Sequence, residues 1–277
     1  MFLLKILRFI YVPIVFHYKK NTSEILSKIK PYVYDCLRYR ETFLFNDSER
    51  PDDKLEDAEK VVYCFWTGDN DLTPARKRSV AQLRSRLSVP LKLITADTLN
   101  EYILAEYPLH PGYKYLSYVH RADYLRCYFM HHYGGGYIDV KECTSTWSGV
   151  FDELNNSDKY ILGYPEGSHF GVCISSTNGN ISKDLMRHWR YVVGNGAYVC
   201  RPRTKFTQEW YDELNSRMDY YYRLLVLNPG DARRRDNIGY PIPWSNILGD
   251  IFQPLCLKYS DRIIQCKDVL PLCRDYK

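Results

Sequence analysis

The sequence predicts an α/β fold in which a central, mostly parallel sheet is flanked by helices. Short, continuously apolar runs alternate with longer segments whose apolar residues recur at helical spacing, and this order is typical of parallel sheets. A chain of 277 residues with 45% hydrophobic residues also suits one compact domain with a short accessory segment. We therefore expect a lead-in segment at residues 1–57 and a single domain at residues 58–277. Within the lead-in we expect a helical piece at Ser23–Tyr39 and a charged loop at Asn46–Glu59.

The first 20 residues are the one membrane-like segment of the chain. Lys5, Arg8 and Pro13 interrupt its apolar run, which falls short of the roughly 20 residues that a spanning helix needs. The segment fits an interfacial helix at lipid headgroups, and it fits equally a helix packed on the domain. No small-residue cleavage site follows, which argues against a signal peptide. We expect a cytoplasmic protein, with peripheral membrane contact through this segment as an open alternative.

The domain is expected to open with a strand, a helix and a second strand. The run Val61–Trp66 is continuously apolar, which predicts a central strand buried on both faces. Pro74 suits the first turn of a helix that ends near Leu87, because the N–H that proline lacks has no helical partner there. A second strand is predicted at Leu91–Thr95, and Asp97 is placed to cap the helix that follows. This order is typical of a Rossmann-like, nucleotide-binding half of an α/β domain.

The stretch Arg121–Glu142 predicts a helix, a glycine turn and a strand. Four apolar residues recur at three- and four-residue spacing and would form one stripe of a helix: Ala122, Leu125, Phe129 and Tyr133. Gly134 suits the left-handed position that ends such a helix, and the two glycines after it allow a tight turn. Tyr137–Val140 has the composition of a short buried strand.

Three charged residues of this stretch should gather where its strand ends. Asp139 is expected at the carboxyl edge of the sheet, where open α/β sheets usually bind ligands. Asp123 and Arg126 lie three residues apart on the helix, so both side chains can reach that edge. Taken alone, such a corner fits a turn that Asp139 merely caps. The three charges together favour a binding site.

The same stretch resembles a known family in its sequence. The residues that carry the resemblance are Ala122-Asp123-Tyr124-Leu125-Arg126 and Tyr133-Gly134-Gly135-Gly136-Tyr137-Ile138-Asp139. They match a helix of the pattern Ser/Ala-Asp-Tyr-x-Arg followed by Tyr-Gly-Gly-x-Tyr-x-Asp-x-Asp. This pattern is the central motif of the sugar-transferring domain containing a DXD motif, found in fungal initiating mannosyltransferases and in capsular-polysaccharide-synthesis glycosyltransferases.

The resemblance implies a GT-A-like glycosyltransferase. Such an enzyme moves a sugar from a nucleoside diphosphate donor, UDP- or GDP-linked, to a hydroxyl of a glycan acceptor. The ends of the first two strands would hold the base and ribose, and in this chain they carry Phe65, Trp66, Thr67 and Asp97. Further donor-binding candidates are Arg121, Asp123, Arg126, Gly135, Gly136, Tyr137, Lys141 and, from the carboxy-terminal region, Trp244.

The chain departs from the family pattern at Lys141, which replaces the second acid of the Asp-x-Asp pair. In the family that carboxylate typically ligates the divalent cation, Mn²⁺ or Mg²⁺, that holds the nucleotide diphosphate. Along a strand Lys141 points the same way as Asp139, so its ammonium would neutralise the diphosphate directly. Alternatively Lys141 is a solvated lysine, and Glu142 joins Asp139 as a metal ligand through a bulge. Both interpretations stay open, and metal dependence with them.

The second half of the chain supplies the remaining candidates. A short helix is expected from Trp147, strands at Lys159–Gly163 and Gly171–Ser175, and helices at Ile181–Val193 and Thr204–Leu227. The loop between those strands would lie across the sugar site, which makes Glu166 and His169 acceptor-side candidates. Arg233–Arg235 fits either a solvated charge run or a loop that closes over a diphosphate. Asp250, on a helix-like segment, completes the catalytic candidates together with Asp139 and Glu166.

Charge and cysteine content bear on other functional classes. A net charge of +5 is too mild to indicate nucleic-acid binding, although it would help to attract an anionic donor. Nine cysteines without a Cys-x-x-Cys pair do not predict a structural zinc site. Most of Cys36, Cys64, Cys127, Cys143 and Cys173 lie in apolar runs, which is typical of core thiols in a reducing compartment.

Two other functions remain open. A catalytically inactive relative that binds glycans or nucleotide sugars would keep the aromatic residues and lose turnover. An Asp-x-Lys at a strand end also occurs in metal-dependent nucleases, with another acid upstream that Asp123 would supply. The nuclease interpretation leaves the triple glycine and the Ala122–Arg126 motif unexplained.

Overall fold

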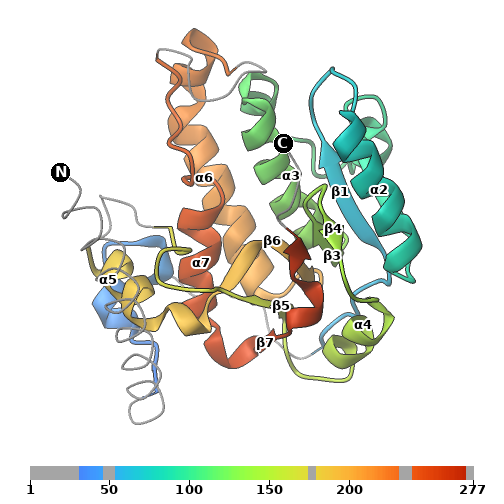
Figure 1. The fold of residues 1–277 in the computed structure, drawn as a ribbon. Coiled ribbons are helices and arrows are strands. Elements are labelled where there is room, and N and C mark those ends of the chain that lie inside the picture. Colours follow the sequence, from blue (N-terminus) through green and yellow to red (C-terminus); the bar gives the residue numbers. More distant parts are fainter. Residues whose placement is uncertain (1–30, 46–53, 174–178, 231–238, 273–277) are drawn as a thin grey trace, which may run out of the picture.

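A six-stranded sheet organises the protein (Figure 1). The structure, a computed structural model, describes residues 31–45, 54–173, 179–230 and 239–272. The strands of this sheet are β1 Val62–Trp66, β2 Leu91–Thr95, β3 Gly135–Ile138, β5 Ile161–Pro165, β6 Val193–Cys200 and β7 Ile263–Gln265. Their spatial order is β2-β1-β3-β6-β5-β7, and within this sheet only β6 runs against the others. The predicted α/β fold with a mostly parallel sheet is confirmed.

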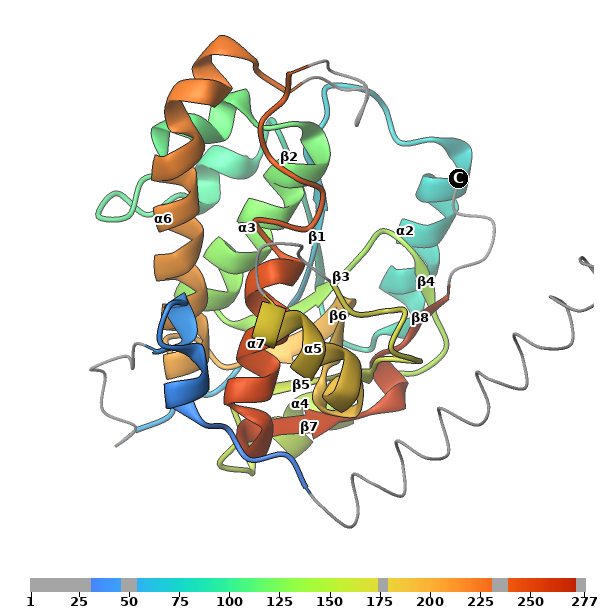
Figure 2. The same cartoon turned by 90° about the vertical axis from the view of Figure 1, so that its left-hand side faces the viewer.

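Helices cover both faces of the sheet. They are α2 Pro74–Arg86, α3 Tyr118–His132, α4 Ser148–Asn155, α5 Gly179–His188, α6 Lys205–Leu227 and α7 Gly249–Lys258. Helices α3, α6 and α7 lie on one face, with α5 beside α7, and α2 and α4 lie on the other (Figures 1 and 2). A second, two-stranded sheet pairs β4 Glu142–Cys143 with β8 Pro271–Leu272. Short 3-10 helices span Cys36–Tyr39, Phe43–Phe45, Leu99–Tyr102, Pro111–Tyr115, Trp189–Tyr191, Ser260–Arg262 and Lys267–Val269.

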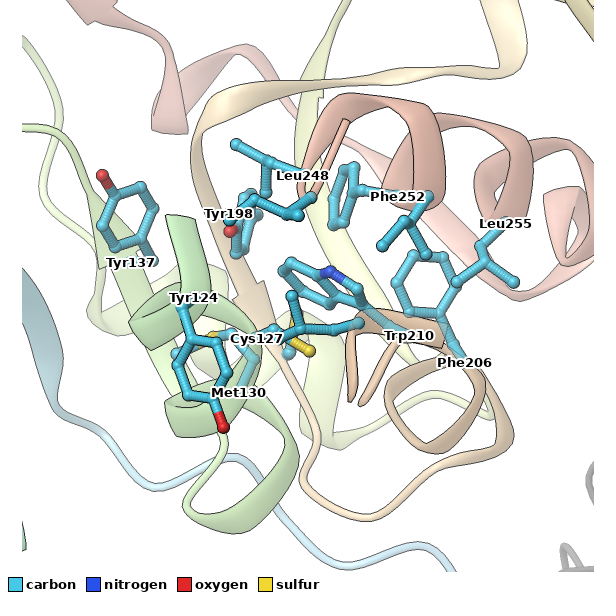
Figure 3. Packing of buried hydrophobic residues seen from close by; sticks show 14 of the residues in the cluster. Tyr124, Cys127, Met130, Tyr137, Tyr198, Phe206, Trp210, Leu248, Phe252 and Leu255 are labelled. Carbon is cyan, nitrogen blue, oxygen red and sulfur yellow. The ribbon is translucent and has the colours of Figure 1, made fainter. Parts of the chain in front are cut away.

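Strand β1 shows why its sequence is apolar without alternation. Tyr63 and Phe65 point into the core beneath α3, α6 and α7, whereas Val62 and Cys64 point into the core beneath α2 and α4. Both faces of the strand are therefore removed from water, as expected for a central parallel strand. In the larger core, Trp210 of α6 lies among aromatic rings in edge-to-face contacts (Figure 3).

The first half of the domain follows the prediction with one exception. Strands β1 and β2 lie where expected, and α2 begins at Pro74. The expectation that Asp97 caps the next helix is wrong. Asp97 is exposed, and the element that follows is the 3-10 helix Leu99–Tyr102, whose N-cap residue is Thr98. The Oγ1 of Thr98 accepts the N–H of Thr95 (3.0 Å) and so closes the turn after β2.

The lead-in segment differs from the prediction in two respects. Within the predicted helix Ser23–Tyr39, the described residues form irregular chain followed by a single 3-10 helix, Cys36–Tyr39. Cys36 is exposed instead of lying in the core, because this turn directs it to the surface. Cys64, Cys127 and Cys143 are buried, as expected.

The described part of the lead-in packs into the larger core. Tyr39 and Leu44 are each 2% exposed. Arg38 forms an ion pair with Asp184 of α5, and Lys258 of α7 donates to the carbonyl oxygen of Leu44 (3.1 Å). Residues 31–45 are thus held against α5 and α7.

The chief difference from the prediction lies at β6. The helix expected at Ile181–Val193 ends at His188, and strand β6 begins at Val193. The described residues of the strand expected at Gly171–Ser175 form irregular chain. Strand β6 occupies the place between β3 and β5 because its run Ala197–Cys200 is fully buried, with apolar side chains directed to both faces of the sheet.

Other elements of the second half lie close to their expected positions. Strand β5 begins two residues later than the predicted Lys159, and α4 follows Trp147 as expected. Helix α6 begins after Thr204, whose side chain accepts the N–H of Thr207 in a capping box. The predicted arginine loop, Arg233–Arg235, lies outside the described residues.

The first 20 residues, which carry the predicted interfacial segment, also lie outside the described residues. Among the helices that the structure does describe, none is long and apolar enough to cross a membrane.

The glycine turn of the central motif has the predicted conformation. Gly134 has a φ of +65°, and its N–H donates to the carbonyl oxygen of Phe129 (3.0 Å), which ends α3 with a left-handed cap. Gly135 has a φ of +88° and lies against β1, since a Cβ there would sit 2.9 Å from the carbonyl oxygen of Val61. The turn therefore joins α3 directly to a strand that is paired with β1.

We expect Gly134→Ala to destabilise the protein by about 2–4 kcal/mol. A left-handed residue with a Cβ costs about 1–2 kcal/mol, and this Cβ would also lie 2.5 Å from Cδ of Pro202. Urea unfolding would measure the change. Gly149→Ala in α4 is the control, because a Cβ there would meet no atom within 4 Å beyond its chain neighbours and its own helix backbone. Helix propensity should make that variant as stable as the wild type or slightly more stable. Equal stability of the two variants would contradict the strain at Gly134.

Candidate functional site

The carboxyl edge of the sheet brings together residues that are far apart in the sequence. Strands β1, β2, β3 and β5 all end at this edge, and the antiparallel β6 begins there. Asp139 follows β3, Glu166 follows β5, and Asn195 lies near the start of β6. Helix α7 also begins here, since a Cβ on Gly249 would lie 3.2 Å from Nδ2 of Asn195. This is the edge at which open α/β sheets usually bind ligands.

Both carboxylate oxygens of Asp139 have donors. Its Oδ1 accepts from Nη2 of Arg126 (3.0 Å) and from the hydroxyl of Tyr137 (2.6 Å). Its Oδ2 accepts from Nζ of Lys141 (2.8 Å). Burial alone would raise the pKa of Asp139, but the cations Arg126 and Lys141 and these hydrogen bonds outweigh it, so the pKa lies below its ordinary value. Asp139 is therefore ionised at neutral pH.

Arg126 connects this carboxylate to its surroundings. Its Nη1 lies 3.6 Å from Oδ1 of Asp123 and 3.3 Å from the carbonyl oxygen of Asn195 in β6. Its guanidinium lies 4.6 Å from the ring centroid of Tyr137. The structure thus brings together Asp123, Arg126 and Asp139, as their spacing in the sequence indicated. Each of the three comes from the motif that resembles the glycosyltransferase family.

Asp123 has a different environment from Asp139. It is 4% exposed. Burial raises its pKa above the ordinary value, although Arg126 and His120 oppose this effect. On the same helix, His120 lies between Tyr240, whose hydroxyl is 2.8 Å from Nδ1, and the carbonyl oxygen of Trp244, 3.2 Å from Nε2. These contacts hold the chain around residues 240–244 against α3 and place Trp244, which is 49% exposed, near this edge.

Two further predicted carboxyl groups lie beside Cys173. Burial raises the pKa of this thiol to about 12, and the nearby charges of Asp250 and Glu166 add to the effect. Asp250 is 6% exposed, and its Oδ1 accepts from the hydroxyl of Ser245 (2.8 Å). Burial raises the pKa of Glu166 to about 7, although a hydrogen bond from the backbone of Gly167 opposes it. Glu166 therefore exchanges a proton in the neutral range.

The residues predicted from the first two strands divide into buried and exposed groups. Phe65 is a core residue whose ring stacks on Tyr137 with centroids 5.5 Å apart. Thr67 is buried and donates its hydroxyl hydrogen bond to the carbonyl oxygen of Tyr118. Trp66 is partly exposed, with its indole N–H on a loop carbonyl, and Asp97 is exposed at the end of β2.

The remaining predicted residues contact neighbouring segments of the protein. Nη2 of Arg121 donates to the carbonyl oxygen of Lys114 (2.7 Å). Gly135 and Gly136 lie against β1, so their lack of a side chain serves strand packing. The ring of His169 is tilted against the exposed ring of Phe170, with centroids 4.0 Å apart.

The sequence did not point to Asn195, Tyr198 or Tyr164. Asn195 and Tyr198 lie on β6, of which only the first residue, Val193, fell in a predicted element. Tyr164 is the last residue but one of β5. The hydroxyl of Tyr164 accepts the N–H of Gly196 (3.2 Å), and a side chain on Gly194 would collide with the Tyr164 ring. Figure 3 shows Tyr198 among the core residues on the α3 side of the sheet. The run Gly194-Asn195-Gly196 is followed by β-forming residues. Because glycine within a strand often marks a place where a ligand or another backbone approaches closely, this run could have predicted a strand beside a binding site.

The donor set at Asp139 does not fit a divalent metal ion. Hard cations such as Mn²⁺ and Mg²⁺ require several oxygen ligands, whereas the oxygens of Asp139 already accept from Arg126, Tyr137 and Lys141. Glu142, the alternative ligand, lies in β4, where it pairs with Leu272 of β8. Across the described ranges, no three His, Cys, Asp or Glu side chains form a group that could hold a metal ion.

Comparison with known proteins leaves the family undetermined. No family model matches the chain, and no curated protein matches it.

We expect Glu166→Gln to change the pH dependence of stability. A carboxyl group with a raised pKa binds more protons in the folded than in the unfolded state, so its ionisation destabilises the fold as pH rises from about 4.5 to about 7. Glutamine does not ionise, so the variant does not lose this stability as pH rises. It should match the wild type near pH 4 and exceed its unfolding free energy by about 1–3 kcal/mol near pH 8.

Urea unfolding across this pH range would measure the difference. Glu106→Gln, at an exposed glutamate, is the control and should parallel the wild type. A Glu166→Gln profile that runs parallel to the wild type would show that Glu166 has an ordinary pKa.

Proposed function

We propose that the protein is a GT-A-like glycosyltransferase that moves a sugar from a UDP- or GDP-linked donor to a hydroxyl of a glycan. The observation that carries this proposal is the joined unit of α3, the glycine turn and β3. This unit holds Asp123, Arg126 and Asp139 in contact at the carboxyl edge of the sheet. A mostly parallel sheet with helices on both faces supports the same proposal, since this architecture suits a nucleotide-binding half.

The proposed reaction breaks the bond between the sugar anomeric carbon and the diphosphate and forms one to the acceptor oxygen. In this scheme Asp139 and Asp123 accept hydrogen bonds from ribose and sugar hydroxyls. Arg126 keeps the two carboxylates in place, because it contacts both. Preorganised groups of this kind stabilise a transition state at little reorganisation cost.

Glu166 is our candidate for the acceptor side. An inverting reaction requires a base that takes the proton of the acceptor hydroxyl, and a pKa near the working pH suits that role. Burial raises the pKa of Glu166 to about 7. Asp250 is more deeply buried and already accepts from Ser245, so we assign it to positioning of the edge.

An inactive relative and a nuclease, the two alternative functions, differ from a transferase in measurable ways. An inactive relative would bind the donor without releasing a nucleoside diphosphate. A nuclease would need Asp139 and Asp123 to share a metal ion, and the contacts of Asp139 with Arg126, Tyr137 and Lys141 give that function no support.

We expect one of UDP and GDP to raise the thermal midpoint of the protein by about 5–10 °C at about 100 times its dissociation constant. Asp139→Asn should weaken that binding at least tenfold, because the carboxylate charge that orients Arg126 is lost. Asp261→Asn, at an exposed aspartate before β7, is the matched control and should bind like the wild type. Release of UDP or GDP from the matching sugar donor would then separate an enzyme from an inactive relative. Absence of a shift with every nucleotide and nucleotide sugar would refute the proposed function.

A further inference from the structure

We infer that Lys141 is a built-in cation that binds the donor diphosphate, so that the nucleotide binds without a divalent metal ion. The inference rests on the proposed function and specifies how that site holds the phosphates. The sequence resemblance implies a metal ion at Asp139, whereas the carboxylate oxygens of Asp139 already accept hydrogen bonds from Arg126, Tyr137 and Lys141.

The contact between Lys141 and Asp139 places a positive charge where the second acid of the motif would be. Nζ of Lys141 lies 2.8 Å from Oδ2 of Asp139. The two side chains are 16% and 21% exposed, so the pair lies at the surface of the edge, within reach of a ligand. An ammonium has three N–H donors and acts on phosphate as a compact point charge. The positive charge of this ammonium can therefore attract a ligand phosphate that approaches the edge.

The charge of this pair equals that of an Asp-x-Asp pair holding one divalent ion. Two carboxylates and a divalent cation have no net charge, and neither do Asp139 and Lys141 together. A metal ion added to the pair would give it two excess positive charges and would compete with Nζ for Oδ2. The substitution of lysine thus replaces both the second acid and its metal.

Side chains of α2 form hydrogen bonds with the turn that carries Lys141. Nη1 of Arg76 donates to the carbonyl oxygen of Val140, and the backbone N–H of Lys141 donates to the carbonyl oxygen of Asp139 (2.6 Å). Two residues later, the side-chain amide of Gln82 donates to the carbonyl oxygen of Cys143 (2.6 Å) and accepts its N–H (3.1 Å). The ammonium is therefore presented by an ordered turn, which reduces the entropy lost on ligand binding.

Titration calorimetry with UDP and with GDP, each in EDTA and in manganese, would test this inference. The wild type should bind one nucleotide with the same affinity, within about twofold, in both solutions. Lys141→Gln and Lys141→Met should weaken binding about 10- to 100-fold in EDTA, because a charge-assisted bond to phosphate is lost. Lys141→Arg should retain most of the affinity, and Lys77→Ala, at an exposed lysine of α2, should leave it unchanged.

Lys141→Asp gives the most specific result. It recreates the Asp-x-Asp pair, so we expect it to bind the nucleotide in manganese and to lose binding in EDTA. Unfolding curves without ligand would show that each variant is folded.

The outcomes separate this inference from the proposed function. A wild type that binds nucleotide in manganese and fails to bind it in EDTA overturns the inference and leaves the proposed function in place. If Lys141→Gln binds the nucleotide in EDTA as tightly as the wild type does, the inference is likewise overturned and the proposed function stays in place. Absence of binding to either nucleotide in both solutions overturns the proposed function, and this inference with it.

Discussion

The site depends on the placement of Arg126. Its side chain is 13% exposed and contacts two carboxylates, a backbone carbonyl and an aromatic ring. A buried guanidinium is tolerated only when its charge is balanced. Asp123 and Asp139 balance that charge, and in return Arg126, together with Lys141, keeps the partly buried Asp139 ionised. Because these partners lie on α3, β3 and β6, the same contacts fix the three elements relative to one another.

The sequence predicted those parts of the site in which local signals are contiguous. The helix, the left-handed Gly134 and the strand before Asp139 lie within some 20 consecutive residues, and each has a signal of its own in backbone conformation or composition. The contact between Arg126 and Asp123 follows from helical spacing alone. The order of β1, α2 and β2 was predicted for the same reason. In each case the structure is decided by residues that are near in the sequence.

The parts that were missed depend on contacts between distant residues. Strand β6 is antiparallel and joins β3 to β5, so its identity depends on strands that no short window contains. Asn195 accepts the hydrogen bond of Arg126 from 69 residues away, and Tyr240 reaches His120 over 120 residues. Asp97 illustrates a local failure: Thr98 lies next to it, and its hydroxyl is the group that closes the turn after β2. The N-cap position of the next element therefore falls on Thr98, one residue later than predicted.

The charges at this edge also explain how it can accept an anionic donor. Four carboxyl groups belong to it, those of Asp123, Asp139, Glu166 and Asp250, against the two cations Arg126 and Lys141. Their formal charge of −2 would repel a diphosphate. Burial reduces that charge, because it raises the pKa of Glu166 to about 7. The ionised carboxylate of Asp139 is the one that both cations contact. A diphosphate that approaches Lys141 therefore meets a site in which Glu166 is partly protonated and Asp139 is paired with two cations. Both effects reduce the cost of bringing like charges together.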